Sequence, residues 1–233
     1  MTAILEARAL RKTYRGGDNE LVEVLNHVDL SVARGEVVAV VGASGAGKST
    51  LLHLLGALEA PTAGEIFLDG VAYGTLSEDH KDTLRNRRLG FVFQFHHLLR
   101  EFTALENVMM PLLIAGRPPA EAESRAAELL ATVGLAGRLT HRPAQLSGGE
   151  QQRCAVARAL VHDPEVLLAD EPSGNLDHAH SGLLHDLLLS LARTLETALV
   201  VVTHNRLLAE LADRVLLLEN GRLHPAGTAE ALP

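Results

Sequence analysis

The chain has 233 residues, 47% of them hydrophobic and 3% aromatic, and its formal net charge is −8. This length supports one substantial core. The acidic balance, the lack of a Lys/Arg run and the absence of tryptophan argue against nucleic acid as the main partner, and the single cysteine, Cys154, excludes an internal disulfide and indicates a reducing compartment.

The N-terminal segment and the lengths of the apolar runs indicate where in the cell the protein is located. Residues 1–6 contain no basic region followed by an apolar one, so they predict no signal peptide. No apolar run reaches the ~18 residues that a membrane helix needs. We therefore expect a cytosolic protein, which would need another subunit to hold it at a membrane.

Three short stretches near the start alternate between apolar and polar residues, at 5–8, 22–25 and 28–32. This period predicts antiparallel strands with one face in water. Tyr14 follows the first stretch, so we expect it in the turn between the first two strands. Its ring could stack on an adenine base, although a lone tyrosine more often serves packing.

A glycine-rich stretch follows the next predicted strand. Residues 37–41 form an apolar, β-branched run that predicts a strand buried on both faces. Residues 51–55 after it predict a helix. Between them the pattern G-x-x-x-x-G-K-[ST] is matched in full by Gly42, Ala43, Ser44, Gly45, Ala46, Gly47, Lys48, Ser49 and Thr50. Strand, glycine loop and helix are the context that a phosphate-binding loop requires.

The chemistry of this loop follows from its residue types. Glycines let backbone N–H groups turn inward as a nest for anions. A helix starting near Lys48 adds about half a positive charge at its N-terminus. The Lys48 ammonium would reach the β- and γ-phosphates of a nucleotide, and the Ser49 hydroxyl would bind Mg²⁺.

Further elements extend both sheets. Residues 65–68 run into the turn Asp69–Gly70, which predicts a hairpin that returns to the small antiparallel sheet. Residues 78–88 predict a polar helix. Residues 89–93 predict another apolar strand, which ends at Gln94.

The hydrophobic period changes to that of helices between residues 95 and 162. Thr103 and Glu106 form a capping box that predicts a helix start. Residues 120–133 place apolar side chains on one side of a second helix. We expect a helical lobe inserted into the α/β core, which serves either packing alone or the docking of another protein.

The stretch Leu146-Ser147-Gly148-Gly149-Glu150 predicts a third helix start. Ser147 and Glu150 form a capping box for a helix that runs to about His162. A well-capped helix start explains the pattern without any ligand. Gly148 and Gly149 are nevertheless poor helix formers, and they would let another group approach the exposed N–H groups closely. A second anion site is the alternative interpretation.

Three later apolar runs predict further strands of a parallel sheet, at residues 166–170, 198–202 and 215–218. The first ends in Asp170, followed by Glu171. A carboxylate at this place in a phosphate-loop protein binds Mg²⁺, often through water, and a neighbouring glutamate can activate the water that attacks the γ-phosphate. A solvated strand exit is the simpler interpretation, and the upstream loop favours the chemical one.

The order of these motifs resembles that of the ATP-binding subunits of ABC transporters, over nearly the whole chain. The motifs that carry the resemblance are residues 42–50, Gln94, residues 146–153, residues 168–172, residues 173–177 and Thr203–His204. The resemblance implies an α/β fold, the ABC ATPase form of the P-loop NTPase fold, with a RecA-like core, a small antiparallel β subdomain and an inserted α-helical subdomain. Residues 1–233 would form a single ABC ATP-binding domain, with the core and β subdomain in about 1–94 and 163–233 and the helical subdomain in about 95–162.

The resemblance also implies an ATP-dependent homodimer. Two copies would pair head to tail and bury two ATP molecules. Each ATP would lie between Lys48 of one copy and Ser147, Gly148 and Gly149 of the other. Tyr14 would stack on the adenine ring.

The resemblance assigns roles to single residues as well. Ser49, Gln94 and Asp170 would surround Mg²⁺, and Gln94 would also link to the membrane partner. Glu171 would act as the catalytic base. His204 would hold the γ-phosphate and the attacking water. Glu150 stands where many family members have Gln, and we expect its carboxylate to cap Ser147.

Residues 91–108, 110–113 and 141–143 resemble the subfamily of LolD, MacB and FtsE, and within it the lipoprotein-release ATPases most closely. This resemblance implies an ATPase on the cytoplasmic side of the inner membrane, held peripherally by membrane subunits of the LolC/LolE type. ATP-driven closure of the dimer would then release lipoproteins. The alternatives are a MacB-like exporter, an FtsE-like cell-division complex and a soluble ABC ATPase without a transport role.

Overall fold

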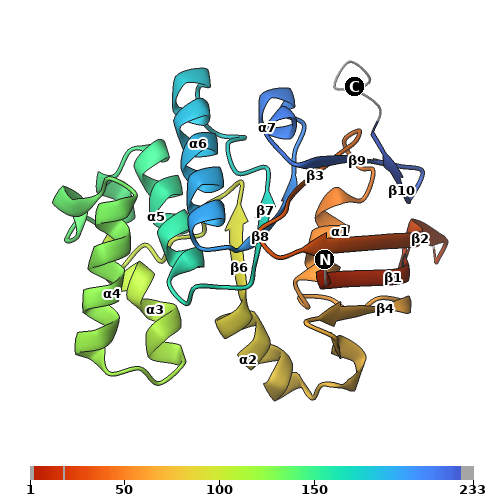
Figure 1. Cartoon of the computed structure of the whole chain (residues 1–233), viewed down its shortest axis with the longest axis horizontal. Coiled ribbons are helices and arrows are strands. Elements are labelled where there is room, and N and C mark those ends of the chain that lie inside the picture. The colour runs from red at the N-terminus through yellow and green to blue at the C-terminus, as the bar shows by residue number, and fades with distance from the viewer. Residues whose placement is uncertain (1–2, 18, 227–233) are drawn as a thin grey trace. The chain divides into compact units, whose positions relative to one another are not determined.

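The computed structural model describes residues 3–17 and 19–226 (Figure 1). The chain divides into two compact units. Unit 1 comprises residues 1–81, 168–171 and 198–233, and unit 2 comprises residues 82–167 and 172–197. How many domains the chain forms stays a prediction.

Unit 1 contains an antiparallel sheet in the strand order β2-β1-β4-β5. Its strands are β1 (Ala3–Arg15), β2 (Leu21–Ala33), β4 (Ala63–Leu68) and β5 (Val71–Ala72), and the first three lie side by side in Figure 1. The short 3₁₀ turn η1 (Tyr73–Thr75) follows β5. Asp69 and Gly70 form the predicted turn, and both have positive φ angles.

The first two strands are longer than the alternation predicts. The stretches 22–25 and 28–32 belong to one strand, β2, because a register irregularity near His27 (φ 58°) absorbs the break in the pattern. Tyr14 does not lie in a turn: it is part of β1 and pairs with Val22. The expected placement of Tyr14 is therefore wrong. Bulges of this kind let a strand continue through a sequence that no longer alternates.

A second sheet contributes further buried strands to unit 1. Its strands in this unit follow the order β10-β9-β3-β8-β7, with β3 parallel to both β8 and β9. The bounds are β3 (Val37–Val41), β7 (Val166–Asp170), β8 (Ala198–Val202), β9 (Arg214–Glu219) and β10 (Arg222–Pro225). Every residue of β3 and β8 is buried, as their apolar runs predict. Helices α1 (Lys48–Leu55) and α7 (Arg206–Glu210) also belong to this unit.

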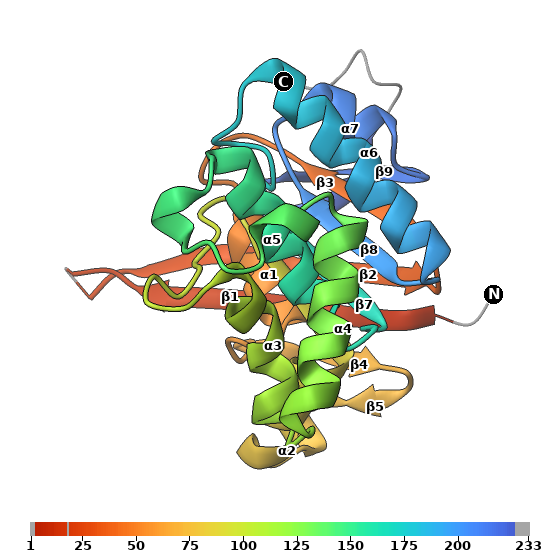
Figure 2. The ribbon, with the colours of Figure 1, turned by 90° about the vertical axis from the view of Figure 1, so that its left-hand side faces the viewer.

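Unit 2 is mainly helical. It holds the end of α2 (Glu78–Arg88), the strand β6 (Leu89–Phe93), the helices α3 (Ala104–Ile114), α4 (Pro119–Thr132), α5 (Gly148–Leu160) and α6 (His178–Thr194), and the 3₁₀ turns η2 (Ala136–Arg138) and η3 (Pro143–Gln145). Figure 2 shows α3 beside α4, and α3 also packs on α5. The buried face of α4 is the predicted one, with Ala122, Ala126, Leu129 and Leu130.

A buried asparagine fixes the segment between β6 and α3. The Asn107 side chain lies on α3 and is fully buried. Its Oδ1 accepts from the N–H of Leu99 (2.7 Å), and its Nδ2 donates to the carbonyl groups of Leu99, Phe102 and Thr103. These bonds satisfy the buried amide fully, as burial requires. These bonds therefore fix the backbone conformation of the segment, although it contains little regular secondary structure.

Among the described residues, no helix combines the length and apolarity that a membrane crossing demands.

Candidate functional site

The predicted phosphate loop joins β3 to α1, and α1 begins at Lys48 as expected. Gly47 caps the helix in the left-handed region (φ 100°). A methyl group there would lie 2.8 Å from Val24 Cγ1. Both the backbone angle and the lack of space therefore favour glycine at this position. Gly42 is similar, because a methyl group would lie 2.4 Å from the carbonyl oxygen of Leu218. The fold of unit 1 itself dictates these glycines.

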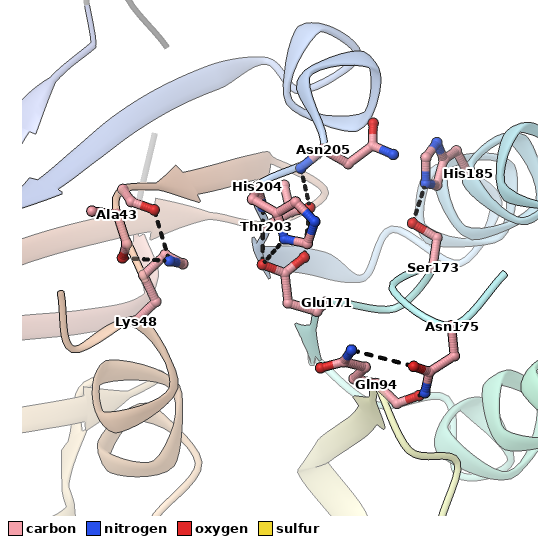
Figure 3. Close-up of polar contacts among 11 residues, drawn as sticks. Ala43, Lys48, Gln94, Glu171, Ser173, Asn175, His185, Thr203, His204 and Asn205 are labelled. Atoms are coloured by element: carbon pink, nitrogen blue, oxygen red, sulfur yellow. Dashed lines mark hydrogen bonds and ion pairs between the residues drawn. The ribbon is translucent and has the colours of Figure 1, made fainter. Parts of the chain in front are cut away.

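The Lys48 ammonium bends back over its own loop. It donates hydrogen bonds to the carbonyl oxygens of Gly42 (2.8 Å) and Ala43 (2.9 Å), as Figure 3 shows. The first turn of α1 contains no acidic residue. Residues 43–46 and the β9–β10 turn line a hollow of about 550 Å³. Glu23 and Glu219 also line this hollow, whereas Lys48 does not. The feature of the loop that suits an anion is therefore the helix N-terminus together with the Lys48 ammonium.

Asp170 and Ser49 lie together at the end of β7 and the start of α1. Burial raises the pKa of Asp170 above its ordinary value, with a smaller rise from the neighbouring Glu171, while a hydrogen bond with Ser49 works in the opposite direction. Mg²⁺ prefers carboxylate and hydroxyl oxygens. This oxygen pair fits a hard cation, and the remaining ligands would come from phosphates and water.

Glu171 and His204 meet in the same unit. Oε1 of Glu171 lies 2.7 Å from Nδ1 of His204 and accepts from the His204 backbone N–H at 2.9 Å (Figure 3). Thr203 donates its hydroxyl to Oε2 at 3.1 Å. The Glu171 side chain is 15% exposed, whereas that of His204 is 72% exposed. The structure thus holds the predicted base by three donors and leaves the histidine accessible.

The backbone of Glu171 carries strain. Its φ is +44°, in the left-handed region that non-glycine residues rarely occupy, at a cost of about 1–3 kcal/mol. Its N–H donates to the carbonyl oxygen of Val202 at 2.9 Å, which fixes it to the end of β8. In this conformation the carboxylate contacts Thr203 and His204.

Tyr14 belongs to a small polar cluster that the sequence does not reveal. Its hydroxyl donates to Glu59 (2.7 Å), and the ammonium of Lys12 lies 4.9 Å from the ring centroid and 2.9 Å from Glu59. Burial raises the pKa of the Tyr14 hydroxyl, and the Glu59 carboxylate adds to the rise. The ring is half-buried and fixed at its hydroxyl end. Sequence reasoning missed Glu59, which is 45 residues from Tyr14, and with it the contact of Lys12 with Glu59.

Gln94 lies just after β6 in unit 2, where it exchanges hydrogen bonds with Asn175. Nδ2 of Asn175 donates to the Gln94 carbonyl oxygen (2.8 Å), and Nε2 of Gln94 donates to Oδ1 of Asn175 (3.3 Å), as Figure 3 shows. Sequence reasoning placed Gln94 correctly at the end of a strand and missed Asn175.

The predicted capping box at Ser147 is present at the start of α5. Glu150 accepts from the Ser147 N–H (2.8 Å) and hydroxyl (2.9 Å), and also from Arg138 (2.9 Å). The Ser147 N–H, Arg138 and the hydroxyl together lower the pKa of Glu150 to about 2. The expectation that Glu150 caps Ser147 is confirmed. Arg138, the second partner, was missed.

Among the described residues, nothing sterically requires the two glycines of this helix start. A methyl group at Gly148 would lie 3.9 Å from Leu176, and one at Gly149 would lie 3.5 Å from His180, both ordinary contacts. Neither glycine has a positive φ. Gly148 is exposed, so its small size leaves room for an outside group to approach closely, whereas Gly149 is buried beside His180.

Comparison with known proteins agrees with these features. The family profile described as ABC transporter matches residues 25–174. A lipoprotein-releasing system ATP-binding protein LolD from Xanthomonas oryzae pv. oryzae is 57% identical over 222 residues, covering 95% of this chain and 91% of that protein. The LolD protein of Legionella pneumophila (strain Lens) is 55% identical over 221 residues, covering 95% and 97%.

Solved structures agree as well. The ATP-binding cassette MJ0796, in a dimeric post-hydrolysis state bound to ADP and Pi, is 38% identical with a TM-score of 0.87. The match covers 94% of this chain and 96% of that one. A dimeric structure of MJ0796 described as a bacterial ABC transporter cassette gives the same values. This chain belongs to the ABC transporter family, in which it is an ATPase cassette with the ABC ATPase fold.

Proposed function

We propose that the chain is the ATP-hydrolysing subunit of a lipoprotein-releasing ABC system. The identity of 55–57% to LolD proteins over 95% of the chain supports this assignment. It agrees with the resemblance of residues 91–108, 110–113 and 141–143 to lipoprotein-release ATPases. The system would use ATP binding and hydrolysis to move lipoproteins out of the bacterial inner membrane.

The phosphate loop binds the nucleotide in this proposal. The residues Gly42 to Thr50 wrap the phosphates, and Lys48 exchanges its loop carbonyl partners for phosphate oxygens. Tyr14, fixed by Glu59, offers its ring to the adenine. Ser49 and Asp170 would hold Mg²⁺, and Gln94 would be a third candidate ligand. When bound, Mg²⁺ would neutralise charge on the β- and γ-phosphates.

Hydrolysis relies on Glu171 and His204. Glu171 orients the attacking water and takes its proton, a contribution of about 10²–10⁴-fold. His204 holds the γ-phosphate, and its 72% exposed side chain leaves room for that contact. The contacts with Thr203 and His204 keep the Glu171 carboxylate aimed until water enters.

The second half of each site comes from another copy of the chain. Ser147, Gly148 and Gly149 form a capped helix start, at which Ser147 and Gly148 are exposed and Gly149 is buried. The dimeric MJ0796 structures support pairing of such cassettes. The observation that carries the proposal is this division: the fold of the phosphate loop requires Gly42 and Gly47, whereas Gly148 at the start of α5 is exposed to an outside group.

We also propose how the subunit reaches the membrane. It would lie peripherally on the cytoplasmic side of the inner membrane, bound to membrane subunits of the LolC/LolE type. The segment 95–102 after Gln94 would contact them, because it exposes the apolar side chains Phe95, Leu99 and Phe102. Residues 1–233 would act as a single ATP-binding domain.

A solution experiment tests the proposal. Glu171→Gln protein is mixed with ATP and Mg²⁺, and its mass is measured by light scattering. We expect a stable dimer that dissociates when the nucleotide is removed. Lys48→Ala on the same background is the matched control and should remain monomeric. A Glu171→Gln protein that stays monomeric while binding ATP would contradict the two-copy site.

A further inference from the structure

A buried histidine lies outside every motif discussed so far. His185 sits on α6 and is 1% exposed. Its Nε2 lies 2.8 Å from the hydroxyl oxygen of Ser173, which is itself 6% exposed (Figure 3). Burial lowers the pKa of His185, while the carboxylate of Asp186 works in the opposite direction. A buried imidazole costs free energy unless it is hydrogen-bonded. The Ser173 contact therefore stabilises His185 in the core, and it also holds Ser173 in place.

Ser173 belongs to the loop between Glu171 and α6, and the next two residues of this loop contact Gln94. Asn175 forms the pair of hydrogen bonds with Gln94 described above. Gly174 lies flat against the Gln94 side chain, because a methyl group at Gly174 would come within 2.9 Å of Nε2 and 3.1 Å of Cδ. The loop is thus fastened to α6 at Ser173 and to Gln94 at Gly174 and Asn175.

We propose that His185 is a positioning residue for Gln94: by holding Ser173, it fixes the loop that grips the Gln94 side chain. The consequence for hydrolysis rests on the role proposed for Gln94 above. His185 itself touches neither nucleotide nor metal in this account. The competing explanation is a satisfied core histidine that stabilises α6 alone.

Four variants separate these explanations. Ser173→Ala removes the hydrogen bond with the smallest change, and His185→Phe removes it from the other side while filling the space. His185→Gln keeps an amide that can replace Nε2. Leu191→Ala is the matched control, because Leu191 is buried on the same helix about 9 Å further from the loop.

Hydrogen exchange of the protein without nucleotide gives the decisive measurement. We expect Ser173→Ala and His185→Phe to speed exchange in residues 94–98 and 173–176 by about tenfold, the effect of one lost buried hydrogen bond. His185→Gln should keep the slow exchange. Leu191→Ala should lower the melting temperature without a selective change in either segment. Wild-type exchange at 94–98 in folded Ser173→Ala and His185→Phe would overturn the proposal.

Steady-state hydrolysis then tests the consequence. Both disruptive variants should lower kcat and raise the Mg²⁺ concentration for half-maximal rate several-fold, with ATP affinity unchanged. Gly174→Ala, whose methyl group displaces Gln94 directly, should reproduce these changes with the His185 contact intact. If Gln94→Ala itself hydrolyses ATP normally, the proposed role of Gln94 fails, while the exchange data still decide the role of His185.

Discussion

Two helix starts in this chain carry glycines, and they do so for opposite reasons. At α1, Gly42 and Gly47 adopt angles and contacts that only glycine tolerates, with methyl positions 2.4 Å from Leu218 and 2.8 Å from Val24. At α5, a methyl group on Gly148 or Gly149 would make ordinary contacts. The first pair is explained by the fold that contains it. The second pair has no such steric explanation among the described residues, and of the two only Gly148 is exposed.

The strongest test of this contrast is Gly47→Ala. The added methyl group strains a backbone at φ 100° and collides with Val24, so we expect a loss of about 1–3 kcal/mol in stability and of measurable ATP binding. Thermal unfolding and equilibrium binding of ATP provide the readouts. Gly137→Ala, which meets no atom within 4 Å, is the control and should leave both unchanged. Normal ATP binding by Gly47→Ala would refute the built-in role of this glycine.

Gly148→Ala should give the reverse outcome. Alanine favours helices over glycine by about 0.5–1 kcal/mol, so the melting temperature should stay the same or rise. The ATP-dependent dimer of the Glu171→Gln background should nevertheless weaken by at least about tenfold, because the methyl group occupies the approach to the N–H groups. Analytical ultracentrifugation measures this. Unchanged dimer affinity would contradict the proposal that a second copy contacts the start of α5 at Gly148.

Glu150 sharpens the comparison, because its carboxylate serves the helix and not the nucleotide. Its folded pKa of about 2 lies below the ordinary value, so its contribution to stability is full above pH 4.5 and disappears as the pH falls toward 2. Glu150→Gln should therefore unfold more easily at pH 7, by about 1 kcal/mol, and the gap should close in acid. ATP-driven dimerisation should remain largely unchanged. A large gain in dimer affinity would contradict the capping role.

The smallest expected effect concerns Tyr14, the proposed contact of the adenine base. Tyr14→Phe keeps the ring but loses the 2.7 Å hydrogen bond to Glu59. ATP affinity should fall about two- to fivefold, in keeping with one partly exposed hydrogen bond. Tripolyphosphate affinity serves as the internal control and should not change, since it lacks a base. Equal losses for both ligands would mean that Tyr14 supports the phosphate loop instead.

Local physics explains which features the sequence predicts. The β3–loop–α1 unit and the capping boxes at Thr103 and Ser147 depend on neighbouring residues, so their patterns suffice. The ABC ATPase fold, the family and the lipoprotein-releasing relatives agree with the sequence-based predictions. The roles of the site residues stay predictions, although the structure brings Glu171 and His204 together.

Features that depend on distant residues were not predictable. β1 and β2 extend through irregular register, which places Tyr14 within a strand. Glu59 reaches Tyr14 across 45 residues, and Arg138 reaches Glu150 across 12. His185 gave no signal at all, because a buried histidine is visible only once Ser173 is placed beside it. Side-chain pairing between separate elements leaves no local pattern in the sequence.

Mixing two inactive variants tests the central claim most directly. Lys48→Ala removes the phosphate-loop cation but keeps the helix tip, whereas Ser147→Arg blocks the tip but keeps the loop. In a mixed dimer, one of the two sites joins an intact loop to an intact tip. The account predicts that the mixture hydrolyses ATP although neither variant does so alone. Absence of hydrolysis in a mixture shown to contain mixed dimers, or normal hydrolysis by Ser147→Arg alone, would contradict it.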